Sequence, residues 1–205
     1  SHFPIWDLIP LALCGQYGWN TGAKQDGETF KADFIRNAER YVDETVFGGV
    51  PVARLMYRLS NYYLLEPERV HCGTMCGLLF HLPITVSKYA YFFDLKDSGD
   101  VFYFDNVVSY VRKIMADVEK LEFDPQLKAE ILINANMVIL ASELCKLRIG
   151  FPLSPVHKEY LLALIDRIEA EYPVLWDKHN FPKGKEIFLS CLDKHRKALL
   201  SMEAV

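Results

Sequence analysis

The chain has 205 residues, of which 51% are hydrophobic and 24% are charged, and its formal net charge is −4. This composition predicts a globular protein with enough apolar residues for one sizeable core. Lys and Arg are spread along the chain without a basic run, so we expect no nucleic-acid partner. The longest apolar stretch, ILINANMVILA, is interrupted by asparagines and falls short of the roughly 20 residues that cross a bilayer, so we expect no membrane partner.

The cysteine pattern predicts reduced thiols. The number of cysteines is odd and each stands among apolar neighbours: Cys14, Cys72, Cys76, Cys145 and Cys191. Buried free thiols are therefore favoured over a disulfide framework, which indicates a cytoplasmic location. The chain opens without the positively charged and apolar segments of a secretory signal.

Gly and Pro separate segments with 3.6-residue periodicity, and strand-like alternation is almost absent. The pattern predicts an all-α fold of about seven to eight helices joined by short loops. The first expected helix, residues 6–18, is nearly all apolar and should be buried on most sides, with a kink or a start at Pro10. The second, residues 28–47, ends at Gly48-Gly49. Its expected apolar face comprises Phe30, Phe34, Ala38, Tyr41, Val42 and Thr45.

Residues 50–65, 71–82 and 84–97 give the next helical segments. Asp124-Pro125 then predicts the start of a helix of about 25 residues that Gly150 ends. Ser154-Pro155 repeats the starting signal for a helix that should bend near Pro173. The last helix begins around Pro182. The residues expected on its apolar side are Ile187, Phe188, Cys191, Leu192, His195 and Leu199.

Two polar clusters suggest metal sites, but their spacing argues against both. Zinc needs tight Cys or His ligand pairs, and the stretch HCGTMCGLLFH offers only wider spacings among Leu and Phe, at His71, Cys72, Cys76 and His81. A calcium loop needs acidic residues at alternate positions, whereas Asp94, Asp97 and Asp100 are three apart. We therefore expect no metal and no cofactor. A pair of Glu-x-x-His motifs for a carboxylate-bound metal centre is also absent.

No catalytic centre follows from the residues. Asp43-Glu44 is the only adjacent Asp-Glu pair, and such pairs serve some glycosidases at the end of a buried strand. Here it lies in the last turn of an amphipathic helix. No nucleophile motif and no Gly-rich phosphate loop occurs.

Aromatic residues are the remaining signal, with 13 Phe, 11 Tyr and 3 Trp. Such side chains stack on sugars, and they also fill cores. For Trp19 we favour packing. For Trp176, which stands beside Asp177, His179 and Asn180 at a helix break, both a structural and a functional role stay open.

Two stretches resemble one family. FPIWDLIPLALCGQYGWN, residues 3–20, resembles the segment by which glycoside hydrolase family 20 β-N-acetylhexosaminidases leave the last barrel strand. EYPVLWDKHNFPKGKE, residues 171–186, resembles the corner that closes an appended helical domain in some members. The match is Leu175-Trp176, His179-Asn180 and Pro182 to Gly184; it departs at His179, where arginine is favoured, and at Lys183 and Lys185.

The resemblance implies a helical C-terminal domain of such a glycosidase. Residues 1–27 would be the barrel-exit segment and first helix, and residues 28–205 the helical domain, packed together as one unit. The parent would remove terminal N-acetylhexosamine by substrate-assisted hydrolysis, with its catalytic residues in a barrel outside this chain. The barrel would be the partner, and the isolated domain would form a homodimer. The residues that would face sugar or barrel are Trp6, Trp19, Trp176, Asp177, His179 and Asn180.

The alternative is a free-standing all-α binding or scaffold protein.

Overall fold

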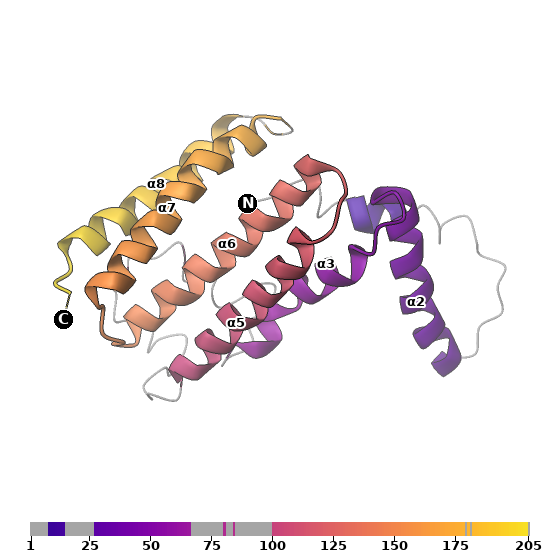
Figure 1. The fold of residues 1–205 in the computed structure, drawn as a ribbon, viewed down its shortest axis with the longest axis horizontal. Helices are drawn as coiled ribbons and strands as arrows, with labels where there is room; N and C mark the ends of the chain where they lie inside the picture. The colour runs from indigo at the N-terminus through magenta and orange to yellow at the C-terminus, as the bar shows by residue number, and fades with distance from the viewer. Residues whose placement is uncertain are drawn as a thin grey trace.

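The computed structural model describes residues 8–14, 27–66, 80, 84, 100–178, 180 and 182–204. These residues form helices and contain no strand, so the predicted all-α fold is confirmed for the described part of the chain (Figure 1). The helical elements are α2 (Gly27–Val46), α3 (Ala53–Ser60), the 3₁₀ helix η1 (Tyr62–Leu65), α5 (Asp100–Glu119), α6 (Pro125–Arg148), α7 (Pro155–Trp176) and α8 (Pro182–Ser201). Residues 8–14 are also helical. None of the described helices has both the length and the apolarity needed to cross a bilayer.

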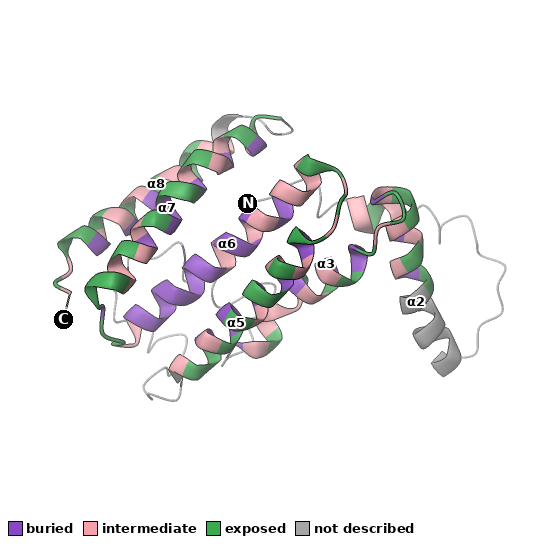
Figure 2. Cartoon of the chain, in the orientation of Figure 1, coloured by how far each residue is buried: buried purple, intermediate pink, exposed green. Residues whose placement is uncertain are grey.

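Helix α6 is the centre of the described fold. It packs against α5 on one side and against α7 on the other, and α8 packs against α7 (Figure 1). Every residue from Ile139 to Leu147 is buried (Figure 2). A helix that is apolar on nearly all sides is buried by neighbours on nearly all sides. The sequence ILASELCKL, residues 139–147, is of this kind and carries only two charged residues. Those two positions, Glu143 and Lys146, belong to the site described below.

The predicted ends of α6 and the start of α7 are confirmed. The Asp124 carboxylate accepts hydrogen bonds from the backbone N–H groups of Gln126 and Leu127, both at 2.9 Å. The chain leaves α6 through Gly150, whose φ of 89° is a left-handed value that residues with a Cβ rarely adopt. Ser154 Oγ then accepts from His157 N–H at 3.2 Å and caps α7. Gly150 and the Ser154 cap fix the two ends of the loop between α6 and α7, which lines one side of the site.

Asp43 holds the turn between α2 and α3. Its carboxylate accepts from the N–H groups of Val52 at 2.9 Å and Ala53 at 2.7 Å, at the start of α3. Gly49 N–H donates to the Asp43 carbonyl at 2.7 Å, which closes α2 as predicted. Asp43 therefore makes structural contacts in the last turn of α2, where the sequence places the Asp43-Glu44 pair.

Four expectations about burial are wrong. Thr45, expected on the apolar face of α2, is exposed. No residue of the helical segment 8–14 is buried; Leu11 is 66% exposed and Cys14 is also exposed. Only Leu8, Ile9 and Leu13 of this segment pack against the core, so it contacts the core along one stripe. In α8, Ile187 is 64% exposed. The buried stripe there is centred on Phe188, Leu192 and Leu199, and a residue adjacent to Phe188 points about 100° away from it.

Candidate functional site

The residues that sequence analysis singled out are only partly described. Trp6, Trp19 and His179 lie outside the described residues, as do the cysteine and histidine residues between positions 71 and 76 and His81. Trp176, Asp177 and Asn180 lie together at the corner between α7 and α8. Among the described residues, no three His, Cys, Asp or Glu side chains gather as metal ligands.

The corner between α7 and α8 is closed by contacts within the chain. The Trp176 indole stacks on Tyr172, with ring centroids 5.5 Å apart. It also lies against Gly184, where an added Cβ would be 2.5 Å from Trp176 Cζ2. The Asp177 carboxylate pairs with Lys185 Nζ at 2.6 Å, and Asn180 N–H donates to the Trp176 carbonyl at 2.9 Å. These contacts fix the start of α8 against the end of α7.

Aromatic packing continues from this corner into the core. Tyr172 stacks on Phe188 at 4.2 Å, and Phe188 stacks on Phe80 at 5.6 Å. His195 Nε2 lies 2.6 Å from the Phe80 carbonyl oxygen. Burial raises the pKa of the Tyr172 hydroxyl above its usual value. Tyr172 and His195 are buried core residues, and a sugar-facing role for Trp176 stays a prediction.

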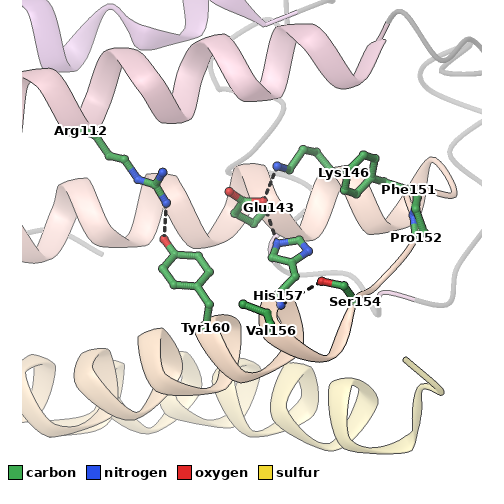
Figure 3. A pocket seen from close by; sticks show the side chains of 9 residues that line it. All are labelled: Arg112, Glu143, Lys146, Phe151, Pro152, Ser154, Val156, His157 and Tyr160. Carbon is green, nitrogen blue, oxygen red and sulfur yellow. Dashed lines mark hydrogen bonds and ion pairs between the residues drawn. The ribbon is translucent and has the colours of Figure 1, made fainter. Parts of the chain in front are cut away.

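A different place on the molecule gathers polar and aromatic groups around a hollow. A pocket of about 470 Å³ lies between α5, α6 and α7 (Figure 3). Its lining residues come from all three helices and from the loop between α6 and α7: Arg112, Glu143, Lys146, Phe151, Pro152, Ser154, Val156, His157 and Tyr160. We refer to it as the α5–α6–α7 pocket.

Helical spacing explains why these side chains meet. Residues three apart share a helix face. This places Glu143 beside Lys146 on α6, and His157 beside Tyr160 on α7. The α6 pair faces α5 and α7, because α6 packs against both. The short loop that follows Gly150 and the Ser154 cap turns the chain back so that the first turn of α7 lies over the end of α6 (Figure 3).

The Glu143 carboxylate joins the two helices. Its Oε2 lies 2.6 Å from Lys146 Nζ and 3.0 Å from His157 Nε2. The side chains of Glu143 and Lys146 are only 6% and 8% exposed. Burial alone would lower the pKa of Lys146, but hydrogen bonds and charges from Asp105 and Glu143 outweigh it and raise that pKa. Lys146 is therefore a buried ammonium group, with Asp105 Oδ1 at 2.7 Å as its second partner.

Aromatic groups and an arginine form the rest of the wall. The His157 ring stacks over Tyr160 at 6.4 Å and meets Phe151 edge-on at 6.3 Å. Arg112 Nη2 donates to the Tyr160 hydroxyl at 2.9 Å, and its guanidinium lies 5.5 Å from the centre of that ring. Arg112 reaches the pocket from α5 on the side opposite the α6–α7 loop (Figure 3).

The contact with Glu143 determines the roles of the two His157 ring nitrogens. When His157 is neutral, Glu143 accepts the Nε2 proton, which leaves Nδ1 as the ring acceptor. A hydroxyl or thiol nucleophile activated by His157 would have to lie in contact with this ring. In the described residues the nearby Ser154 hydroxyl instead accepts the His157 backbone N–H as a helix cap. What remains is a charged, aromatic pocket with preformed hydrogen bonds.

No family model, curated protein or solved structure matches this chain. The resemblance to family 20 glycosidases therefore stays a prediction that rests on its two sequence windows.

The pocket is absent from the sequence-based predictions. One local signal could have indicated it: Glu143 and Lys146 stand inside an apolar run, where charged residues are rarely fully buried unless they are paired.

Proposed function

We propose that this chain is an all-helical binding domain that holds a small ligand in the α5–α6–α7 pocket. The observation that carries the proposal is the burial of two opposite charges, Glu143 and Lys146, in the pocket wall. The proposed function is the free-standing binding protein that the sequence offers as the alternative.

Burying the charges of Glu143 and Lys146 costs free energy. Taking two charges out of water is expensive, and well-packed apolar residues of similar volume often stabilise a fold as well or better. Ligand pockets, in contrast, combine apolar walls with a few placed polar groups that orient the ligand. Glu143 and Lys146, surrounded by Phe151, Val156 and Tyr160, fit that description.

We keep a second proposal, that the chain is the helical C-terminal domain of a family 20-like glycosidase and packs against the parent barrel. Its support is the window at residues 171–186, which forms a compact corner through Trp176, Gly184 and the Asp177–Lys185 ion pair. A reducing, cytoplasmic location is proposed with either function, since Cys145 is a free thiol in the core.

The binding proposal is tested with a fragment library that contains neutral, cationic and anionic aromatic compounds. Binding is followed by ligand-detected NMR with the wild-type chain and with Val156→Trp. Val156 is 77% exposed at the pocket wall, so a tryptophan there narrows the pocket without disturbing the core. The matched control is Val174→Trp on the same helix, at a residue 61% exposed in a separate hollow of about 250 Å³.

The proposal expects at least one fragment whose binding is lost in Val156→Trp and kept in Val174→Trp. Fragments are small, and the binding free energy per non-hydrogen atom is at most about 1.5 kcal/mol for the smallest ligands and about 0.3 kcal/mol for drug-sized ones. We therefore expect dissociation constants of about a millimolar. If both variants are folded and no fragment binds Val174→Trp while failing to bind Val156→Trp, the proposed function is wrong.

A further inference from the structure

Among the basic side chains that line the pocket, Arg112 is the one that contacts no carboxylate of a described residue. Lys146 contacts two carboxylates, and the His157 ring contacts Glu143. Arg112 makes no ion pair with a described residue; its contact is with the ring and hydroxyl of Tyr160. A guanidinium has five N–H donors, and the Tyr160 hydroxyl takes one. The others are open to a carboxylate or a phosphate, either of which arginine binds with two parallel hydrogen bonds.

The first turn of α7 adds a second positive feature. Ser154, Val156 and His157 all line the pocket, so the N-terminal end of α7 is part of its wall. Ser154 accepts the N–H groups of His157 and Lys158 through its side chain and carbonyl. Val156 N–H has no acceptor among the described residues. Unpaired N–H groups and the helix dipole favour an anion at this end.

The remaining wall is apolar. Phe151, Pro152 and Val156 form the side of the pocket next to the α6–α7 loop, and Phe151 and Val156 are exposed at 37% and 77%. A solvated inorganic ion alone would leave these side chains in water. An apolar ring or chain attached to the anion would cover them and gain from their burial.

We propose that the ligand of the α5–α6–α7 pocket carries an oxyanion, a carboxylate or a phosphate, on a flat or branched apolar body. The oxyanion pairs with Arg112 near the first turn of α7, and the apolar body lies on Phe151, Pro152 and Val156. Glu143 holds Lys146 and His157 in place beneath it. This inference rests on the proposed binding function and gives that ligand its chemical class.

The test compares phenyl compounds of different charge, together with an anion that has no apolar body. Phenylacetate, phenyl phosphate, the neutral phenylacetamide and inorganic phosphate are titrated into the full chain by calorimetry or NMR. The variants are Arg112→Gln and, as the matched control, Lys113→Gln, which removes a neighbouring exposed cation of α5 that does not line the pocket. Both positions are exposed, so neither change threatens folding.

We expect phenylacetate or phenyl phosphate to bind at least about tenfold more tightly than phenylacetamide, the effect of one charge-assisted hydrogen bond. Arg112→Gln should abolish this preference and Lys113→Gln should keep it. Whichever of the two anions binds more tightly identifies the carboxylate or the phosphate source.

Three results would overturn the inference. The first is equal binding of the neutral and anionic probes. The second is an anion preference that survives Arg112→Gln, and the third is binding of inorganic phosphate as tight as that of phenyl phosphate.

If neutral or cationic fragments bind and Val156→Trp blocks them, the oxyanion inference fails while the binding function stands. If no fragment of any charge binds, both fail.

Discussion

Glu143 is the residue on which the pocket depends, because it holds a lysine and a histidine from two helices at one carboxylate oxygen. Its contacts with Lys146 Nζ at 2.6 Å and with His157 Nε2 at 3.0 Å are made almost without solvent. Asp105, the other partner of Lys146, is 50% exposed and so offers a more weakly held charge. Removing Glu143 therefore leaves a buried ammonium group with one solvated partner.

We predict that Glu143→Ala lowers the free energy of unfolding by about 3 kcal/mol, since breaking one side of a buried ion pair leaves a charge uncompensated. The double variant Glu143→Leu/Lys146→Met should lie close to wild type, because it removes both charges at similar volume. Urea unfolding followed by circular dichroism measures both. A double variant as unstable as the single one would show that the two charges support the fold rather than the pocket.

Asp43 gives a prediction about pH. Burial raises the pKa of its carboxyl, and the hydrogen bonds from Ala53 and Val52 oppose that shift without cancelling it. The folded protein therefore holds this proton more tightly than the unfolded chain. The contribution of Asp43 to stability is then greatest at low pH, and it falls as pH rises from about 3.9, the usual value, through the raised pKa.

Asp43→Asn keeps an acceptor oxygen for the two N–H groups of α3 and removes the charge. In this variant we expect the free energy of unfolding not to show the decrease that Asp43 causes between acidic and neutral pH. At pH 7 it should equal or exceed that of wild type. Asp43→Ala should lose about 1 kcal/mol, the usual value of a helix cap. Glu44→Gln, at the exposed neighbour, is the control in unfolding experiments across this pH range. A steeper fall in Asp43→Asn than in wild type would contradict the assigned pKa direction.

At the scale of elements, the corner between α7 and α8 depends on the close approach of Trp176 to Gly184. Replacing Gly with Ala inside a helix usually stabilises it by roughly 0.5 to 1 kcal/mol. Here the new Cβ would lie 2.5 Å from Cζ2 of an indole that is stacked on Tyr172, so the ring or α8 would have to shift and the stacking would be disturbed. The sign of the effect should therefore reverse.

We predict that Gly184→Ala destabilises the chain by about 1 to 3 kcal/mol, the range for overpacked sites. In the background of Trp176→Ala the same change should be neutral or stabilising, so the double-mutant cycle gives a coupling energy of opposite sign to the single effect. Ser190→Ala, at an exposed position of α8, is the control for helix propensity. A stabilising Gly184→Ala in wild type would mean that α8 does not pack on Trp176.

Element boundaries were predictable where local chemistry sets them. Asp124, Ser154 and Gly150 act through hydrogen bonds or backbone angles of adjacent residues, so the limits of α6 and the start of α7 follow from short sequence signals. The ends of α5 do not follow from such signals, because its start carries no proline. Its spacing could have shown it, since Phe104, Val107, Val111 and Ile114 are buried at intervals of three and four.

At the scale of the whole molecule, the pocket could not be predicted because no single segment contains it. Arg112, Glu143 and His157 come from three helices, and only the packing of α5 and α7 on α6 brings them together. Periodicity assigns each of them to a face of its own helix. It does not determine which faces meet, so the sequence indicates the charged pair Glu143 and Lys146 without identifying the residues of α5 and α7 that complete the pocket.

The α5–α6–α7 pocket is where we propose that this chain binds a small ligand. The most direct measurement is a ¹H–¹⁵N NMR titration of the full chain with the tightest fragment from the library. We predict that the resonances that move are those of residues 105–112, 143–146 and 151–160. Changes centred on the α7–α8 corner, or on the hollow around Ala129 and Val174, would place the binding site elsewhere and contradict the claim.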